Sequence, residues 1–152
     1  MKSLVLSALL LSSSLTAAPL DEVKKSFEGS HIQKNDWVSV QQADYQQASN
    51  ADKYRILNVK LSSKEGMVKV DFTNIENDHV SAAEGYCWKL AGLTPLVFPE
   101  TWSDTTPDQS ALSLAYIGPL ENGATRKAVV KGWTFIRYRM ENTIYCSAKE
   151  GA

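Results

Sequence analysis

The two cysteines carry the most reactive side chains of this chain of 152 residues. Cys87 lies between aromatic residues in EGYCWKL, and Cys146 follows a tyrosine in NTIYCSA. A cysteine nucleophile needs a free thiol and a partner base, and a zinc site needs further Cys or His ligands. The chain has only His31 and His79 as histidines and contains no CxxC pair. In an exported chain the two cysteines are therefore predicted to form one disulfide, because oxidising compartments favour pairing.

The beginning of the chain has the pattern of a cleavable secretory signal. Lys2 gives a positive start, an uncharged run of Leu, Val, Ala and Ser extends from Leu4 to Leu15, and small residues follow. The run is too short to span a bilayer well, which takes about 20 apolar residues. We predict a signal peptide over residues 1–18, cut after Ala18, with Ala17 as the alternative. The protein is then periplasmic or secreted.

Residues 19–152 have the size of a single globular domain, and we predict that the disulfide cross-links it. A bridge that closes a loop of roughly 60 residues stabilises a fold by about 4 kcal/mol in the chain-entropy model. The whole chain has 16 basic and 17 acidic side chains, so it offers no broad positive field to nucleic acid. No second long apolar segment follows, so no transmembrane segment is expected in the mature chain.

Known catalytic motifs are missing from the sequence. It contains no GxSxG, HExxH, P-loop or GxGxxG pattern, and we predict no metal site and no cofactor. One loop, PETWSD, places Glu100 and Asp104 on either side of Trp102. An aromatic platform with acidic hydrogen-bond acceptors suits a sugar site, although a Trp in a long connection more often covers the core.

The segment GWTFIRYRM is the most interesting surface candidate. In an extended segment alternate residues share a face, and two aromatics and two arginines share one of them: Trp133, Phe135, Arg137 and Arg139. The other face carries Thr134, Ile136, Tyr138 and Met140, so neither face is plainly polar. One interpretation is an exposed aromatic and guanidinium ridge that recognises a partner, because Trp, Tyr and Arg dominate interface hot spots. The other is a central strand covered on both faces.

Several elements can be assigned from residue patterns. Alternation in YRILNVKL and MVKVDFTNI, joined by SSKEG, predicts an antiparallel hairpin. We also predict a strand over GYCWKLAG, a long β segment after ENGA, and a last strand containing NTIYCS. Short helices are predicted over PLDEVKKSFEGS and over residues 107–117. In the second helix Thr106 provides a cap and Pro107 the first position, although its residues also alternate as in a strand.

These elements predict a mainly β protein. The first arrangement is an antiparallel β-sandwich, immunoglobulin-like in general character, with one or two short helices. The alternative is an α+β layer, in which helices cover one face of an antiparallel sheet.

We interpret the chain as an exported, non-catalytic binding protein, such as an inhibitor, adaptor or immunity-type partner. Its partner is then another exported or cell-envelope protein. The alternative is a small secreted hydrolase that acts on carbohydrate. A deep pocket with two facing carboxylates would favour the hydrolase, and a broad aromatic patch would favour the binding protein.

Overall fold

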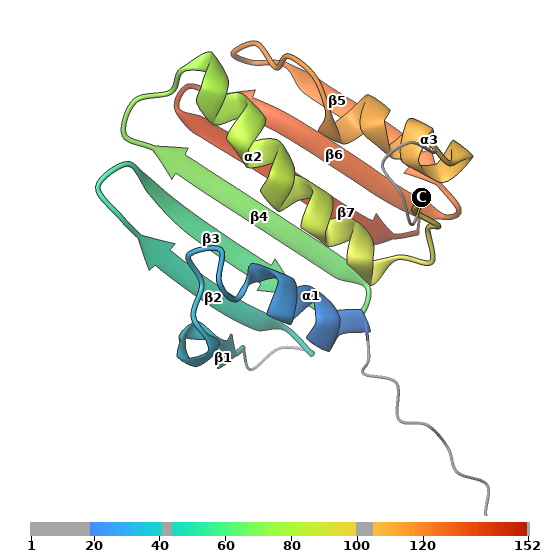
Figure 1. Cartoon of the computed structure of the whole chain (residues 1–152), viewed down its shortest axis with the longest axis horizontal. Helices are drawn as coiled ribbons and strands as arrows, with labels where there is room; N and C mark the ends of the chain where they lie inside the picture. Colours follow the sequence, from blue (N-terminus) through green and yellow to red (C-terminus); the bar gives the residue numbers. More distant parts are fainter. Residues whose placement is uncertain (1–18, 41–43, 100–104, 152) are drawn as a thin grey trace, which may run out of the picture.

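The computed structural model of the chain describes residues 19–40, 44–99 and 105–151. The predicted signal peptide over residues 1–18 and the loop residues Glu100, Trp102 and Asp104 lie outside the described residues. Within them, seven strands form one antiparallel sheet (Figure 1). The strands are β1 (Val38–Ser39), β2 (Gln46–Ala51), β3 (Arg55–Leu61), β4 (Glu65–Phe72), β5 (Thr125–Val130), β6 (Trp133–Met140) and β7 (Thr143–Glu150).

The sheet consists of two meanders that meet at its centre. Its strand order is β1-β2-β3-β4-β7-β6-β5, so β2 to β4 form one meander and β5 to β7 the other. The two meanders join where β4 pairs with β7, with Val68 opposite Cys146. Short turns connect β2 to β3, β3 to β4, β5 to β6 and β6 to β7. Lys131 and Gly132, both at positive φ, form the turn from β5 to β6.

Three α-helices lie on the same side of the sheet (Figure 1): α1 (Pro19–Phe27), α2 (Asn77–Lys89) and α3 (Pro107–Tyr116). Two short 3₁₀ helices, η1 (Lys34–Asp36) and η2 (Leu90–Leu93), accompany them. The core fills the space between this helical layer and the inward residues of the strands. Its largest fully buried apolar side chains include Tyr116, Phe27, Phe135, Ile32 and Leu57.

The mainly antiparallel β class predicted from the sequence is confirmed. Of the two arrangements, the alternative is the one that forms, because the described strands make one sheet with helices on one face. The first arrangement, a sandwich of two sheets, is therefore not present among these residues. The helices cover the apolar face of the sheet, and this removes the need for a second sheet.

The strand predicted over GYCWKLAG is wrong, because these residues belong to α2 and η2. Val80, Ala83, Cys87 and Leu90 recur at helical spacing, and all four are buried against the sheet. Burial of this stripe outweighs the β preference of the aromatic residues beside Cys87.

The helices predicted over the first residues and over residues 107–117 are confirmed as α1 and α3. Thr106 caps α3, since its Oγ1 accepts a hydrogen bond from the backbone N–H of Gln109 at 3.1 Å. The strand β2 was missed, because only Ala48 in its polar sequence is buried.

Candidate functional site

The structure places the predicted ridge on the inward face of β6. Trp133 is 5 % exposed, and Phe135 and Arg137 are 0 % exposed, so these three side chains offer no surface to a partner. Arg139, near the end of the strand, is half-buried. The exposed-ridge hypothesis is therefore wrong for this face, because α3 packs on β5 and β6 and covers it. The covered-strand interpretation is confirmed for one face only.

Arg137 is the largest fully buried side chain among the described residues, and it is held by a dense network. Its Nη1 donates to the carbonyl oxygen of Tyr116 at 2.6 Å and to Oε1 of Glu84 at 3.1 Å. Its Nη2 donates to the carbonyl oxygen of Gly118. Glu84 Oε1 also accepts from the N–H of Gly118 at 2.9 Å. The network therefore fixes the chain after α3 to α2 and β6.

The end of α3 explains why an arginine is buried here. The last carbonyl groups of a helix have no partner inside the helix, and they attract cations. Arg126 on β5 donates to the carbonyl oxygen of Ile117 at 2.7 Å and lies opposite Arg137 in the sheet. Burial lowers the pKa of Arg137 from its ordinary value, and the nearby Glu84 carboxylate opposes that shift. The two arginines together hold the end of α3 and the residues after it.

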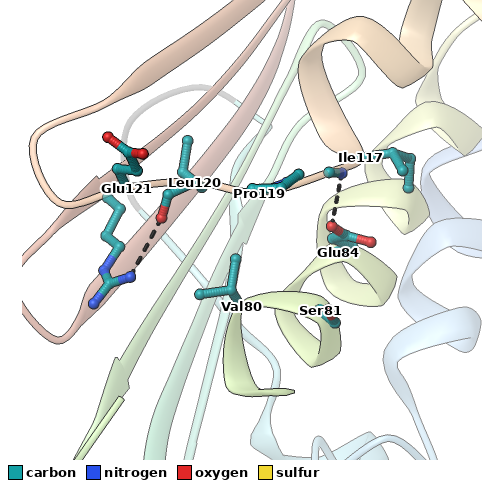
Figure 2. A pocket seen from close by; sticks show the side chains of 9 residues that line it. Val80, Ser81, Glu84, Ile117, Pro119, Leu120 and Glu121 are labelled. Carbon is teal, nitrogen blue, oxygen red and sulfur yellow. Dashed lines mark hydrogen bonds between the residues drawn. The ribbon is translucent and has the colours of Figure 1, made fainter. Parts of the chain in front are cut away.

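A cavity of about 500 Å³ lies beside this network, between α2 and the residues that follow α3 (Figure 2). Glu84 and Glu121 both line it, and they would favour a hydrolase if their carboxylates faced each other. Figure 2 shows Glu84 on α2 and Glu121 on the far side of the cavity, with its carboxylate turned away. Glu84 already accepts from Gly118 and Arg137, so it serves as a counter-ion. This geometry does not favour a pair of facing catalytic carboxylates.

The outward face of the sheet has a different character. Antiparallel sheets with one covered face usually carry polar residues on the other. Here the register of β4, β7 and β6 places apolar and aromatic residues side by side on the uncovered face. We call this set the outer face: Met67, Ile136, Tyr138, Met140 and Tyr145. Met140 is 63 % exposed and the other four are half-buried.

Two tyrosines form the centre of the outer face. Tyr138 and Tyr145 lie directly opposite each other on β6 and β7, and their rings stack with centroids 5.0 Å apart. Tyr145 Oη lies 2.7 Å from Sδ of Met67, to which it donates. Burial raises the pKa of Tyr145, and the neighbouring Tyr138 and Glu65 add to the shift. Tyr145 is therefore neutral at ordinary pH, and the centre of the face is aromatic.

Charged residues surround this centre. The outward positions of β3, β4, β5 and β7 carry four lysines against two carboxylates, while the whole chain has a net charge of −1. Asp71 pairs with Lys69 at 2.9 Å, and Glu65 accepts a hydrogen bond from Tyr45 at 2.6 Å. The other three lysines, which form no ion pair with a described carboxylate, are Lys60, Lys127 and Lys149.

The predicted disulfide is confirmed. Cys87 and Cys146 are bonded, with their Cα atoms 5.4 Å apart, and both side chains are fully buried. The bond joins the last turn of α2 to β7, where a strand-to-strand link had been expected. Its burial agrees with a structural role for both cysteines.

No family model matches the chain, and no curated protein or solved structure matches it. The described helices include none that is long and apolar enough to cross a membrane. Over the same residues, no group of three or more His, Cys, Asp or Glu side chains could hold a metal ion.

The functional interpretation therefore depends on the geometry of the chain itself. Sequence reasoning singled out β6, but the face that it proposed for recognition is covered by α3. The sequence signal for the uncovered face was the apolar character of Ile136, Tyr138 and Met140. A strand with one solvent-exposed face carries polar residues at such positions. The buried role of Arg137 had a signal too, since it alternates with Trp133 and Phe135 on one face.

Proposed function

We propose that the protein is an exported, non-catalytic binding protein that docks onto an acidic surface of another cell-envelope protein through its outer face. The observation that carries the proposal is the stacked pair Tyr138 and Tyr145 at the centre of a sheet face without a helical cover. Export is supported by the secretory pattern of residues 1–18 and by the buried disulfide between Cys87 and Cys146.

The composition of the outer face supports protein recognition. Interface centres are enriched in Tyr and Met, depleted in charged residues, and surrounded by a polar rim. The outer face follows this plan, with two tyrosines and two methionines inside and charged side chains around them. Rigid aromatic rings also lose little conformational freedom on binding, which makes Tyr138 and Tyr145 suitable anchors.

Charge selects the kind of partner. Lys60, Lys127 and Lys149 surround the outer face without an acidic partner among the described residues. Complementary potentials speed encounter and suppress wrong partners, so an acidic protein surface is the matching occupant. A nucleic acid is less suitable, because the overall charge of the chain is slightly negative.

Site-directed photo-crosslinking tests this proposal. A photoreactive amino acid at Ile136, on the outer face, is expected to give a defined protein adduct in the cell envelope. The matched control position is Leu114, which is 68 % exposed on α3, in the helical layer on the other side of the sheet. The adduct from position 136 should weaken with added salt and disappear in the double variant Lys127→Glu/Lys149→Glu, because both changes remove the charge attraction.

Three results would overturn the proposal. They are equal adducts from both positions, no adduct from position 136, and an adduct that persists after the charge reversal. Thermal unfolding of each variant confirms that the fold is intact, since exposed lysines contribute little to stability.

A further inference from the structure

A second cavity lies on the other side of the sheet from the outer face, between α2 and α3. Its volume is about 520 Å³, within the range of small-molecule sites. We call it the α2–α3 groove. Gly85 and Trp88 line it from α2, and Gln109 and Ser113 line it from α3. Trp88 is half-buried, with one edge packed against Phe98 at 5.7 Å between ring centroids.

Two polar groups of the α2–α3 groove are hydrogen-bond acceptors that lack a donor. Gln109 Oε1 is buried and has no hydrogen-bond partner among the described residues. Ser113 Oγ donates its only proton to the backbone oxygen of Gln109 at 2.8 Å, so it can only accept from a ligand. A buried acceptor without a donor is costly, and native structures rarely leave one unsatisfied. The groove therefore suits a ligand with many donor groups.

Gly85 gives a second, independent indication that the α2–α3 groove binds a ligand. It lies in the interior of α2, where glycine weakens a helix relative to alanine. A Cβ atom added at Gly85 would meet no atom within 4 Å, so packing does not require the glycine. Its effect is to leave the helix backbone open beside the indole of Trp88. A flat ligand can then lie against both.

We propose that the α2–α3 groove binds a neutral oligosaccharide. A sugar ring has an apolar face of C–H groups, which packs on Trp88 above Gly85, and hydroxyl groups, which donate to Ser113 Oγ. Gln109 Oε1 accepts a further hydroxyl once its half-buried side chain turns into the groove. The other donor-rich ligand, a cationic amine, is disfavoured because Lys89 lines the groove and the Glu84 carboxylate, which also lines it, is already paired with Arg137. The inference does not depend on the outer face, and either site can fail without the other.

The test is a titration of the intact, oxidised protein, followed through its tryptophan indole N–H resonances by NMR. The probes are maltohexaose, cellohexaose and chitohexaose, each at up to millimolar concentration. At least one probe should shift the indole resonance of Trp88, while that of the buried Trp133 stays in place. No shift of Trp88 with any of the three would overturn the proposal.

Three variants sharpen the titration. Gly85→Leu should weaken saccharide binding about tenfold or more, because its side chain covers the open backbone. Ala82→Leu is the matched control, since Ala82 is exposed on α2 but does not line the groove, and its affinity should be unchanged. Gly85→Ala should raise the melting temperature and weaken binding together, a combination that a purely structural role does not produce.

An unchanged affinity for the saccharide in Gly85→Leu would refute the assignment. If Gly85→Leu does not fold, Gln109→Leu takes its place, and unchanged affinity there refutes it equally.

Discussion

The ion pair of half-buried Glu84 with fully buried Arg137 gives the sharpest test of the fold. Replacing Glu84 by Ala removes the carboxylate that accepts hydrogen bonds from Arg137 and from the N–H of Gly118. Arg137 then remains fully buried, with only the carbonyl oxygens of Tyr116 and Gly118 as partners. A buried guanidinium without its counter-ion is strongly unfavourable, so the variant should be much less stable than the parent protein.

The size of the effect follows from the contacts. Removing one partner of a buried ion pair costs about 3–5 kcal/mol. The two carbonyl acceptors that remain on Arg137 place the loss near the lower end, at about 3 kcal/mol. Glu84→Gln keeps an acceptor for Gly118 and loses only the charge, so we expect about 1–2 kcal/mol. The double variant Glu84→Ala/Arg137→Met removes both charges and should lose less than the sum of the single variants.

Urea unfolding, followed by circular dichroism and tryptophan fluorescence, measures these differences. The slope of the free energy of unfolding against urea should stay constant across the five proteins, which are the parent, Glu84→Ala, Glu84→Gln, Arg137→Met and the double variant, so that the midpoints report stability alone. A loss below about 1 kcal/mol in Glu84→Ala would refute the reasoning. Additive losses in the double variant would do so too, because they would show that the two side chains are not coupled.

Three further predictions follow from other parts of the molecule. Cys87→Ser should lower the free energy of unfolding by about 2–5 kcal/mol, because it opens the bridge to Cys146, and the same denaturation assay measures this. The hydrogen bonds from Lys131 and from the N–H of Val97 lower the pKa of Asp108, so the unfolded chain takes up a proton there first as pH falls. This contribution is complete above the unfolded pKa of about 4 and is lost at lower pH, so Asp108→Asn should show a smaller drop in stability on acidification. Sequencing of protein recovered from its native compartment should give an N-terminus near residue 19, and one at Met1 would exclude cleavage.

Much of the fold is readable from local patterns. The hairpin of β3 and β4 alternates Val68 and Val70 with Lys69, and a period of two is enough to assign such a strand. Thr106 and Pro107 mark the start of α3 by a cap and a fixed φ, both of which are local effects. The disulfide is assigned by counting, since two cysteines allow one pairing.

The missed features depend on distant contacts. The buried stripe of α2 includes the small residue Ala83, and the helix also contains Gly85, so the helical period of apolar residues is weak until the sheet beneath it is known. The choice of face on β6 is also undecided locally, because both faces contain apolar residues. Alternation places Arg137 on the same face as Trp133 and Phe135, but its counter-ion Glu84 lies 53 residues earlier, so no local pattern shows that this face can be the buried one.

The junction of β4 with β7 also has a consequence for how the chain folds. Each meander closes through neighbouring strands, and such local contacts form quickly. Across the junction, by contrast, Met67 meets Tyr145 at a separation of 78 residues. We therefore expect the first meander to form before β7 pairs with β4, which leaves β4 with one unpaired edge for a time. An unpaired edge can join the wrong strand, and charges such as Lys69 and Asp71 on β4 are the residue types that discourage such pairing. The arrival of β7 ends this exposure and brings Cys146 to Cys87, so formation of the disulfide reports completion of the sheet.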